Sequence, residues 1–186
     1  MKRALVAITV MLGAIAFTPS AHADDLECVG AIEGGDVDNV IVPAGAVCYL
    51  NVSTVRGNVD VREGATFISA CSTVAGNVTA DGAEDVVLTC STIGGRVQVV
   101  RGGEGFVGTS FVAGDVVFAE NAGEIEIMDN VIRGSVQARR NTAGVTIEDN
   151  RIHTNLQCSQ NDPRPVGGNN RVGGTKSGQC RALSPG

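Results

Sequence analysis

The chain has 186 residues, with 14 basic and 20 acidic side chains and a formal net charge of −6 at pH 7. The excess of carboxylates argues against nucleic acid as a partner, because phosphates are held by Lys and Arg. The same excess argues against electrostatic binding to anionic lipid. The length predicts a single domain.

Residues 1–23 have the pattern of a secretory signal peptide. Lys2 and Arg3 form a basic start, residues 4–17 are apolar, and Ala21-His22-Ala23 has the small-x-small form that signal peptidase cuts. The apolar run is shorter than the ~20 residues of a membrane-spanning helix. We therefore predict cleavage after Ala23, no membrane span after cleavage, and a secreted protein that is extracellular or at the cell surface. Loss of Lys2 and Arg3 leaves 12 basic against 20 acidic residues (14 − 2 = 12), a formal charge of −8.

Residues 24–50 are predicted to form an N-terminal cap and a first coil. Residues 51–157 then carry a glycine, or its replacement, every 19 or 20 residues. These positions are Gly57, Gly76, Gly95, Gly114, Gly134 and Thr154. A fixed period of this size indicates a stack of one structural unit.

Apolar residues keep a fixed phase in each repeat. They stand two before the glycine and two and four after it, as in Val74-Ala75-Gly76-Asn77-Val78, with mainly polar residues between. Alternation of this kind is typical of a half-buried strand. We thus predict one strand around each glycine, a second about eight residues earlier, and glycine-rich turns with positive φ between them. Val97 and Val136 should point inward, and Gln98 and Gln137 outward.

A polar residue also recurs four positions before each glycine or its equivalent. These residues are Ser53, Ser72, Ser91, Ser110, Asn130, Asn150 and Asn170. Stacked at the strand spacing, they can hydrogen-bond along the pile as a ladder. The predicted fold is therefore all-β: a single-stranded parallel β-helix (β-solenoid) of about seven coils, right-handed and stapled by disulfides.

Six cysteines in an exported chain indicate disulfides, and six allow 15 connectivities. Cys71 and Cys90 both stand five residues before their glycine, so one should lie above the other at a distance that a disulfide tolerates. The remaining cysteines pair by neighbourhood at the two ends, as Cys28–Cys48 and Cys158–Cys180. Residues 158–186 lose the repeat pattern and are predicted to form a C-terminal cap and tail, with one degraded coil before Cys180.

The best candidate ligand cluster lies on two adjacent coils and consists of Asp129, Asp149, Arg139 and Arg140. Asp129 and Asp149 share one offset and should stack, so a cation or an arginine would have to lie between them. The alternative is a solvated coil edge. His153 is expected to be a surface residue, since no nucleophile motif accompanies it. No phosphate loop, dinucleotide fingerprint or zinc-ligand spacing is present, so neither a cofactor nor a metal is predicted.

The period and the V-x-G-x-V units resemble the repeats of filamentous-haemagglutinin-type adhesins. Gly57-Asn58-Val59 and Gly76-Asn77-Val78 are also similar to the repeats of bactofilins. The resemblance spans residues 55 to about 157 and implies the β-helix fold. The signal peptide and cysteines depart from bactofilins, and the short length departs from the adhesins, so neither function carries over.

The sequence therefore predicts a secreted structural or surface-interaction protein without catalytic activity. Its partner is unnamed, with a cell-envelope component or a polysaccharide as the expected classes. The alternatives are a carbohydrate-binding or polysaccharide-active (lyase-like) β-helix and a self-assembling solenoid. Few aromatic side chains are available to cover sugar rings, and Tyr49 and Phe111 are the best placed.

Overall fold

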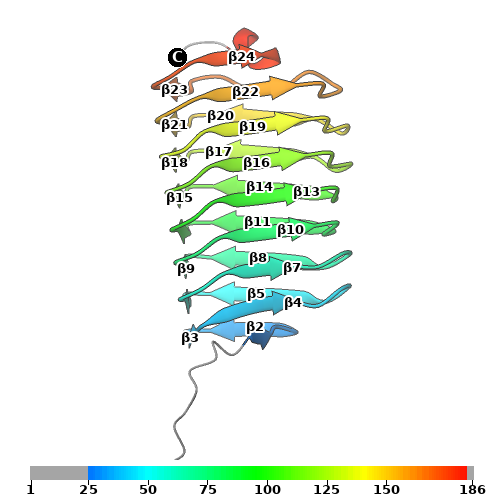
Figure 1. Ribbon diagram of the computed structural model, residues 1–186, viewed down its shortest axis with the longest axis vertical. Helices are drawn as coiled ribbons and strands as arrows, with labels where there is room; N and C mark the ends of the chain where they lie inside the picture. The colour runs from blue at the N-terminus through cyan, green and yellow to red at the C-terminus, as the bar shows by residue number, and fades with distance from the viewer. Residues whose placement is uncertain (1–24, 184–186) are drawn as a thin grey trace, which may run out of the picture.

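The structure is a computed structural model that describes residues 25–183. It is an all-β parallel solenoid of about eight turns, stacked into a straight column (Figure 1). The predicted signal peptide lies outside the described residues. No helix in the described range has the length and apolar character needed to cross a bilayer.

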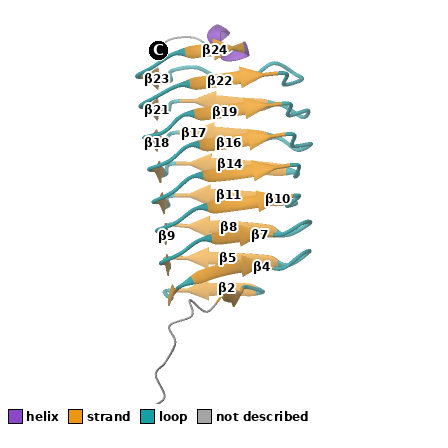
Figure 2. Ribbon diagram, viewed as in Figure 1, coloured by secondary structure: helices purple, strands orange, loops and turns teal. Residues whose placement is uncertain are grey.

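Three parallel sheets, here called A, B and C, run along the column, and each turn before the last contributes one strand to each (Figure 2). Sheet A contains β1 (Asp25–Glu27), β4 (Asn39–Val42), β7 (Val59–Val61), β10 (Val78–Asp81), β13 (Val97–Val100), β16 (Val116–Ala119), β19 (Val136–Arg139), β22 (Leu156–Ser159) and β24 (Lys176–Gly178). Sheet B contains β2 (Gly30–Glu33), β5 (Val47–Asn51), β8 (Thr66–Ala70), β11 (Asp85–Thr89), β14 (Glu104–Gly108), β17 (Ile125–Met128) and β20 (Val145–Glu148). Sheet C contains β3 (Asp36–Val37), β6 (Thr54–Val55), β9 (Thr73–Val74), β12 (Thr92–Ile93), β15 (Phe111–Val112), β18 (Val131–Ile132), β21 (Arg151–Ile152) and β23 (Arg171–Val172).

The register confirms the repeat. Val78 lies beside Val97, Val97 beside Val116, and Val116 beside Val136. Val97 and Val136 are fully buried, whereas Gln98 and Gln137 are half-buried on the outside, as predicted. Inward β-branched side chains from all three sheets form one continuous core, which supplies most of the driving force for folding.

The prediction of a single strand around each glycine is wrong. In Val74-Ala75-Gly76-Asn77-Val78, the first valine ends β9 of sheet C and the last begins β10 of sheet A, so the glycine lies at the corner between two sheets. Both valines point inward because the chain bends around the core. The glycine is needed for close approach: a Cβ on Gly76 would lie 2.5 Å from the carbonyl oxygen of Gly57 on the previous turn.

The glycine-rich turns lie at the corner between sheets A and B, and only some have the predicted positive φ. Gly64 and Gly82 do, with φ of 66° and 72°. In later turns the left-handed conformation falls on Arg101, Glu120 and Arg140, with φ between 53° and 61°. Gly102, Gly103 and Gly123 are instead packed against the backbone of the turn below.

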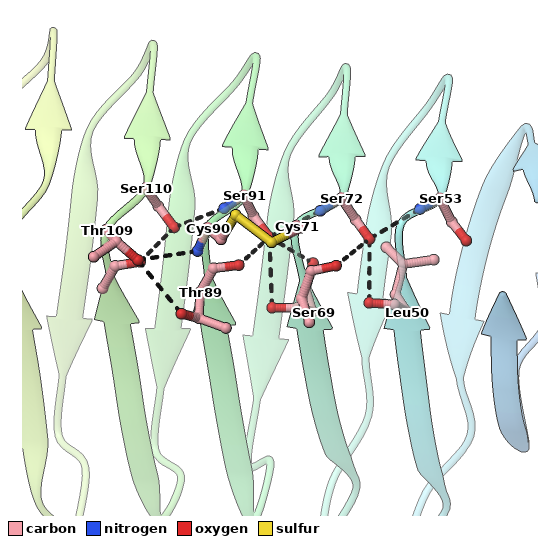
Figure 3. The surroundings of a disulfide bond; sticks show 12 residues. Leu50, Ser53, Ser69, Cys71, Ser72, Thr89, Cys90, Ser91, Thr109 and Ser110 are labelled. Carbon is pink, nitrogen blue, oxygen red and sulfur yellow. Dashed lines mark hydrogen bonds between the residues drawn. A yellow bond between two sulfur atoms is a disulfide. The ribbon is translucent and has the colours of Figure 1, made fainter. Parts of the chain in front are cut away.

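The predicted polar ladder forms at the corner between sheets B and C. Ser53, Ser72, Ser91 and Ser110 are buried, and the Ser72 hydroxyl accepts from the Ser53 N–H at 3.1 Å (Figure 3). Asn130, Asn150 and Asn170 continue the ladder, and Asn150 Oδ1 accepts from Asn130 Nδ2 at 3.0 Å. No buried side-chain nitrogen or oxygen in residues 25–183 lacks a hydrogen-bond partner.

All three predicted disulfides are present. The Cα–Cα distances are 5.5 Å for Cys28–Cys48, 4.4 Å for Cys71–Cys90 and 5.1 Å for Cys158–Cys180. Cys71 and Cys90 link adjacent turns outside the serine ladder (Figure 3). The outer two pairs tie down the first and last described turns.

The predicted degraded coil before Cys180 is present at the C-terminal end. β23 continues sheet C and β24 continues sheet A, and Val166 forms a bridge to Thr146 of sheet B. The short 3-10 helix η1 (Gln179–Ala182) then lies over the last turn (Figure 2), with Cys180 and the following Leu183 buried. The N-terminal turn has no such cover among the described residues: β1 is exposed along its whole length.

Candidate functional site

Most strands alternate between buried and outward side chains, so the column has three outer faces with different chemistry. On sheet A the outward row is mostly polar: Asp60, Thr79, Gln98, Val117, Gln137 and Gln157. At the corner before it, Asn77 Oδ1 accepts the Arg96 N–H at 2.9 Å, and Asn155 Oδ1 accepts the Thr175 N–H at 3.0 Å. The asparagines beside this polar row are therefore partly engaged in holding one turn to the next.

Sheet B has an apolar row along the middle of its outer face. Register places Ala31 beside Tyr49, Tyr49 beside Ile68, Ile68 beside Val87, and Val87 beside Phe106. Tyr49 is 48 % exposed, and the next three are half-buried. The Phe106 ring lies over Gly108, where any Cβ would collide with it. The row is therefore flat, and adjacent members are about 4.8 Å apart.

Carboxylates border this row, and no basic side chain points outward from the described strands of sheet B. The acidic residues on or next to these strands include Glu33, Asp85, Glu104, Glu124, Glu126 and Glu148. Asp85, Glu104, Glu124 and Glu126 surround a shallow hollow of about 170 Å³ whose apolar lining is Val87 and Phe106.

The nearby carboxylates affect the pKa of one residue in this group, Asp85. Burial raises the pKa of the Asp85 carboxyl above its ordinary value, and the neighbouring Glu104 charge raises it further. The Val86 N–H opposes this by hydrogen bonding to the carboxylate. Positive charge placed over this margin would relieve the repulsion.

Sheet C changes character along its length. Its outward row begins with Asp36, Thr54, Thr73 and Thr92 and continues with Phe111, Val131, Arg151 and Arg171. Arg133 lies over the Phe111 ring, with its guanidinium carbon 5.5 Å from the ring centroid. The last turns of sheet C therefore present a row of guanidinium groups.

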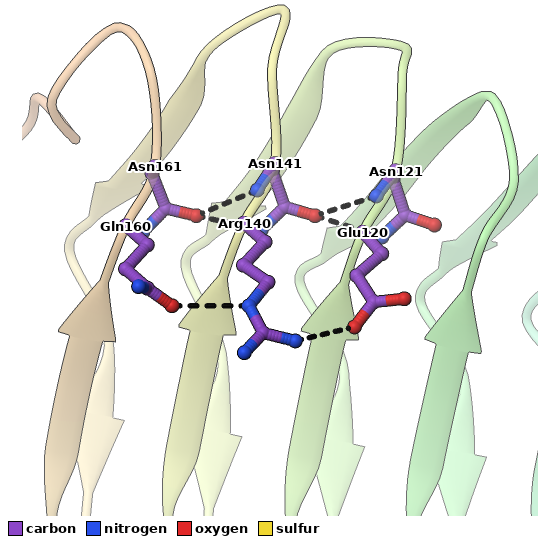
Figure 4. Close-up of polar contacts among 6 residues, drawn as sticks. All are labelled: Glu120, Asn121, Arg140, Asn141, Gln160 and Asn161. Carbon is purple, nitrogen blue, oxygen red and sulfur yellow. Dashed lines mark hydrogen bonds and ion pairs between the residues drawn. The ribbon is translucent and has the colours of Figure 1, made fainter.

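The structure does not bring the four predicted cluster residues together. Asp129 and Asp149 stack at the B–C corner with φ of 58° and 56°, as their shared offset predicted. Arg139 ends β19, and Arg140 follows it at the A–B corner, so β20 and the turn before it separate the arginines from the aspartates. Arg140 instead contacts Glu120 Oε1 and Gln160 Oε1, both at 3.0 Å (Figure 4). This arrangement is a surface ladder of side chains across three turns.

His153 is exposed at the C–A corner. Within residues 25–183, no group of three or more His, Cys, Asp or Glu side chains is positioned to hold a metal ion.

The sheet B face and the sheet C arginines were missed in the sequence. The sequence indicated Tyr49 and Phe111 as the best-placed aromatic residues, and it gave no binding role to Phe106, Arg151 or Arg171. The signal was available, because each set keeps one offset within the repeat, but it needed the register of strands away from the glycine. Comparisons with protein-family models, curated proteins and solved structures find no match to this chain.

Proposed function

We propose that this protein is an exported, disulfide-stapled surface-interaction rod without catalytic activity, and that sheet B carries its binding face for a basic protein partner of the cell envelope. The observation that supports it best is the apolar row from Tyr49 to Phe106, bordered on one side by carboxylates. Exposed apolar rows with a polar border are typical of protein interaction sites.

The chemistry of this face defines the partner. A protein segment that covers the row would bury Tyr49, Ile68, Val87 and Phe106, and would need Lys or Arg opposite Asp85 and Glu104. Such pairing lowers the cost of desolvating the carboxylates and speeds encounter between the two proteins. A rigid sheet adds little ordering cost on binding, since its side chains are already held by the neighbouring turns.

Export is supported by the signal-peptide pattern and by the three disulfides, because structural disulfides persist in oxidising compartments. The lack of catalysis is supported by the separation of Asp129 and Asp149 from Arg139 and Arg140, which leaves no convergent carboxylate–arginine site there.

The binding face can be tested with a pair of variants. Cell-envelope proteins of the producing organism would be cross-linked to the parent protein and to a Tyr49→Ser/Phe106→Ser variant. Val117→Ser is the control, because Val117 is a half-buried apolar residue on the outer face of sheet A and belongs to neither proposed site. We expect the parent and the control to capture the same basic protein and the double variant to lose it. Equal capture by all three would contradict the proposal.

Catalysis is tested separately with uronic-acid polymers, with and without calcium. We expect no turnover. Turnover in the parent that disappears in Asp129→Ala or Arg139→Ala would overturn the non-catalytic assignment and establish a lyase-like site.

A further inference from the structure

The last turns of sheet C carry a basic patch, defined here as Arg133, Arg151, His153 and Arg171. Register places Arg151 directly beside Arg171, about 4.8 Å apart at the backbone. Like charges stacked in this way repel each other unless a counter-charge lies nearby. The patch is basic although the mature chain has a predicted formal charge of −8.

None of the described carboxylates forms an ion pair with these arginines. The ion pairs of residues 25–183 involve Arg56, Arg62, Arg101 and Arg140. Asp149, two residues before Arg151, is the carboxylate nearest in sequence, and the equivalent position before Arg171 is the neutral Asn169. The guanidinium groups therefore keep their donors available.

The patch also surrounds a hollow. Arg151, His153 and Arg171 line a space of about 490 Å³ together with Gly173. Gly173 stands above His153, because a Cβ placed on Gly173 would lie 2.5 Å from the His153 carbonyl oxygen. Gly173 therefore lets the backbones of the two turns approach closely at the edge of the hollow, and Arg151 and Arg171 supply its charged side chains.

We propose that this hollow is a binding site for the carboxylates of a linear acidic polysaccharide that runs along sheet C. Planar guanidinium groups bind carboxylates through paired hydrogen bonds, and two of them one turn apart can hold one carboxylate or two successive ones. Val131, next in the row, is an exposed apolar residue and fits the C–H face of a sugar ring, which a simple phosphate polymer lacks. Arg133, placed by the Phe111 ring, extends the basic row by one turn.

The sheet B face and the basic patch share no residue, so one can fail while the other stands. The inference keeps the non-catalytic assignment of the proposed function: the polymer is bound and not cleaved.

The test is calorimetric titration of the purified protein with polygalacturonate. Its neutral methyl ester and inorganic polyphosphate serve as comparison ligands. Arg151→Gln/Arg171→Gln should weaken polygalacturonate binding at least 10-fold. The control Arg56→Gln/Arg62→Gln removes the same charge from ion-paired positions near the other end and should leave binding within 2-fold. Arg151→Lys/Arg171→Lys should lie between the two, because it keeps the charge but not the paired hydrogen bonds.

Thermal melts would establish that each variant is folded before titration. Absence of polygalacturonate binding in the folded parent would overturn the proposal, as would equal binding of the methyl ester. Equal weakening in the control pair would reduce the effect to net charge and also reject a site. Tighter binding of polyphosphate than of polygalacturonate would reassign the patch to phosphate polymers and contradict the carboxylate assignment.

Discussion

The two halves of the column use different side chains to link one turn to the next at the corners between sheets. In the first half, serines fill the B–C corner and a disulfide joins two of the turns, Cys71 to Cys90. In the second half, asparagines fill this corner, and a second buried asparagine ladder fills the A–B corner: Asn121, Asn141 and Asn161. Gln179 of η1 closes the second ladder by accepting from Asn161 N–H at 2.9 Å.

The change coincides with a change in coil length. Val97 pairs with Val116, 19 residues on, whereas Gly105 pairs with Ile125, 20 residues on. The added residue therefore lies between sheets A and B, where Asn121 first appears. The longer corner has room for an inward amide, and each amide both donates and accepts between turns (Figure 4). The residue inserted in each later turn thus gives the second half an additional hydrogen-bonded column at the A–B corner.

The largest effect should come from Asn141→Ala. Asn141 is fully buried, its Oδ1 accepts from Asn121, and its Nδ2 donates to Asn161 Oδ1 at 2.9 Å and to the Phe118 carbonyl at 3.2 Å. Each buried group left without a partner costs about 1–3 kcal/mol, so we expect urea denaturation to show a loss on the order of 4 kcal/mol.

The neighbouring Arg140→Ala is the matched control, since it removes an exposed ladder at the same corner. Such surface pairs contribute about 0–1 kcal/mol. If the two substitutions had equal effects on the free energy of unfolding, the inner ladder would not be what stabilises the second half.

Removing the staple of the first half should have the next largest effect. Cys71→Ser/Cys90→Ser opens a loop of 19 residues, which lowers the free energy of unfolding by about 3 kcal/mol in the chain-entropy model. Denaturation of this variant beside the parent under non-reducing conditions checks the value. An unchanged midpoint would mean that the serine ladder is sufficient without the disulfide.

Ser91→Ala should cost less than Asn141→Ala, about 1 kcal/mol. The Ser91 hydroxyl donates to the Thr89 carbonyl at 2.9 Å and lies 3.0 Å from the Ser69 hydroxyl. It makes fewer contacts between turns than an amide does. A cost equal to that of Asn141→Ala would remove the distinction between the two ladders.

The smallest effect concerns the outer face of sheet B. Because the folded-state pKa of Asp85 is raised, its protonated form is favoured on folding, and this contribution is present at acidic pH and lost as pH rises through the folded-state pKa. Asp85→Asn should therefore raise the melting temperature slightly at pH 7 and lose this advantage in acid. A lower melting temperature at pH 7 would contradict the crowding of charge at this margin.

The regular part of this fold could be read from the sequence, and the corners could not. Equal offsets placed Cys71 under Cys90, Ser53 under Ser72 and Val97 beside Val116, because a stacked repeat converts offset directly into position. The bend at Gly76 was hidden because valines on both sides point into the same core, which alternation along one strand mimics. Because the positions of the corners were not predicted, Asp149 and Arg139 were assigned to one cluster. Their distance depends on which corner each residue occupies.

The chemistry of the outward-facing rows was also hard to predict from the sequence. Phe106 and Arg171 each repeat a position, but their neighbours in the row differ in chemistry from turn to turn. Only the strand register links Tyr49 to Phe106 or Val131 to Arg171. The inner ladders and disulfides link one turn to the next without these outer rows.

The most direct measurement of this account is amide hydrogen exchange, followed by mass spectrometry, on the parent protein and on Cys71→Ser/Cys90→Ser. Turns of a solenoid exchange according to their own stability and that of their neighbours. We predict faster exchange in β8 to β13 of the variant and unchanged exchange in β16 to β20, where the two asparagine ladders hold the column. Equal acceleration along the whole column would show a single cooperative unit and contradict the division of the protein into a half that depends on Cys71–Cys90 and a half held by asparagine ladders.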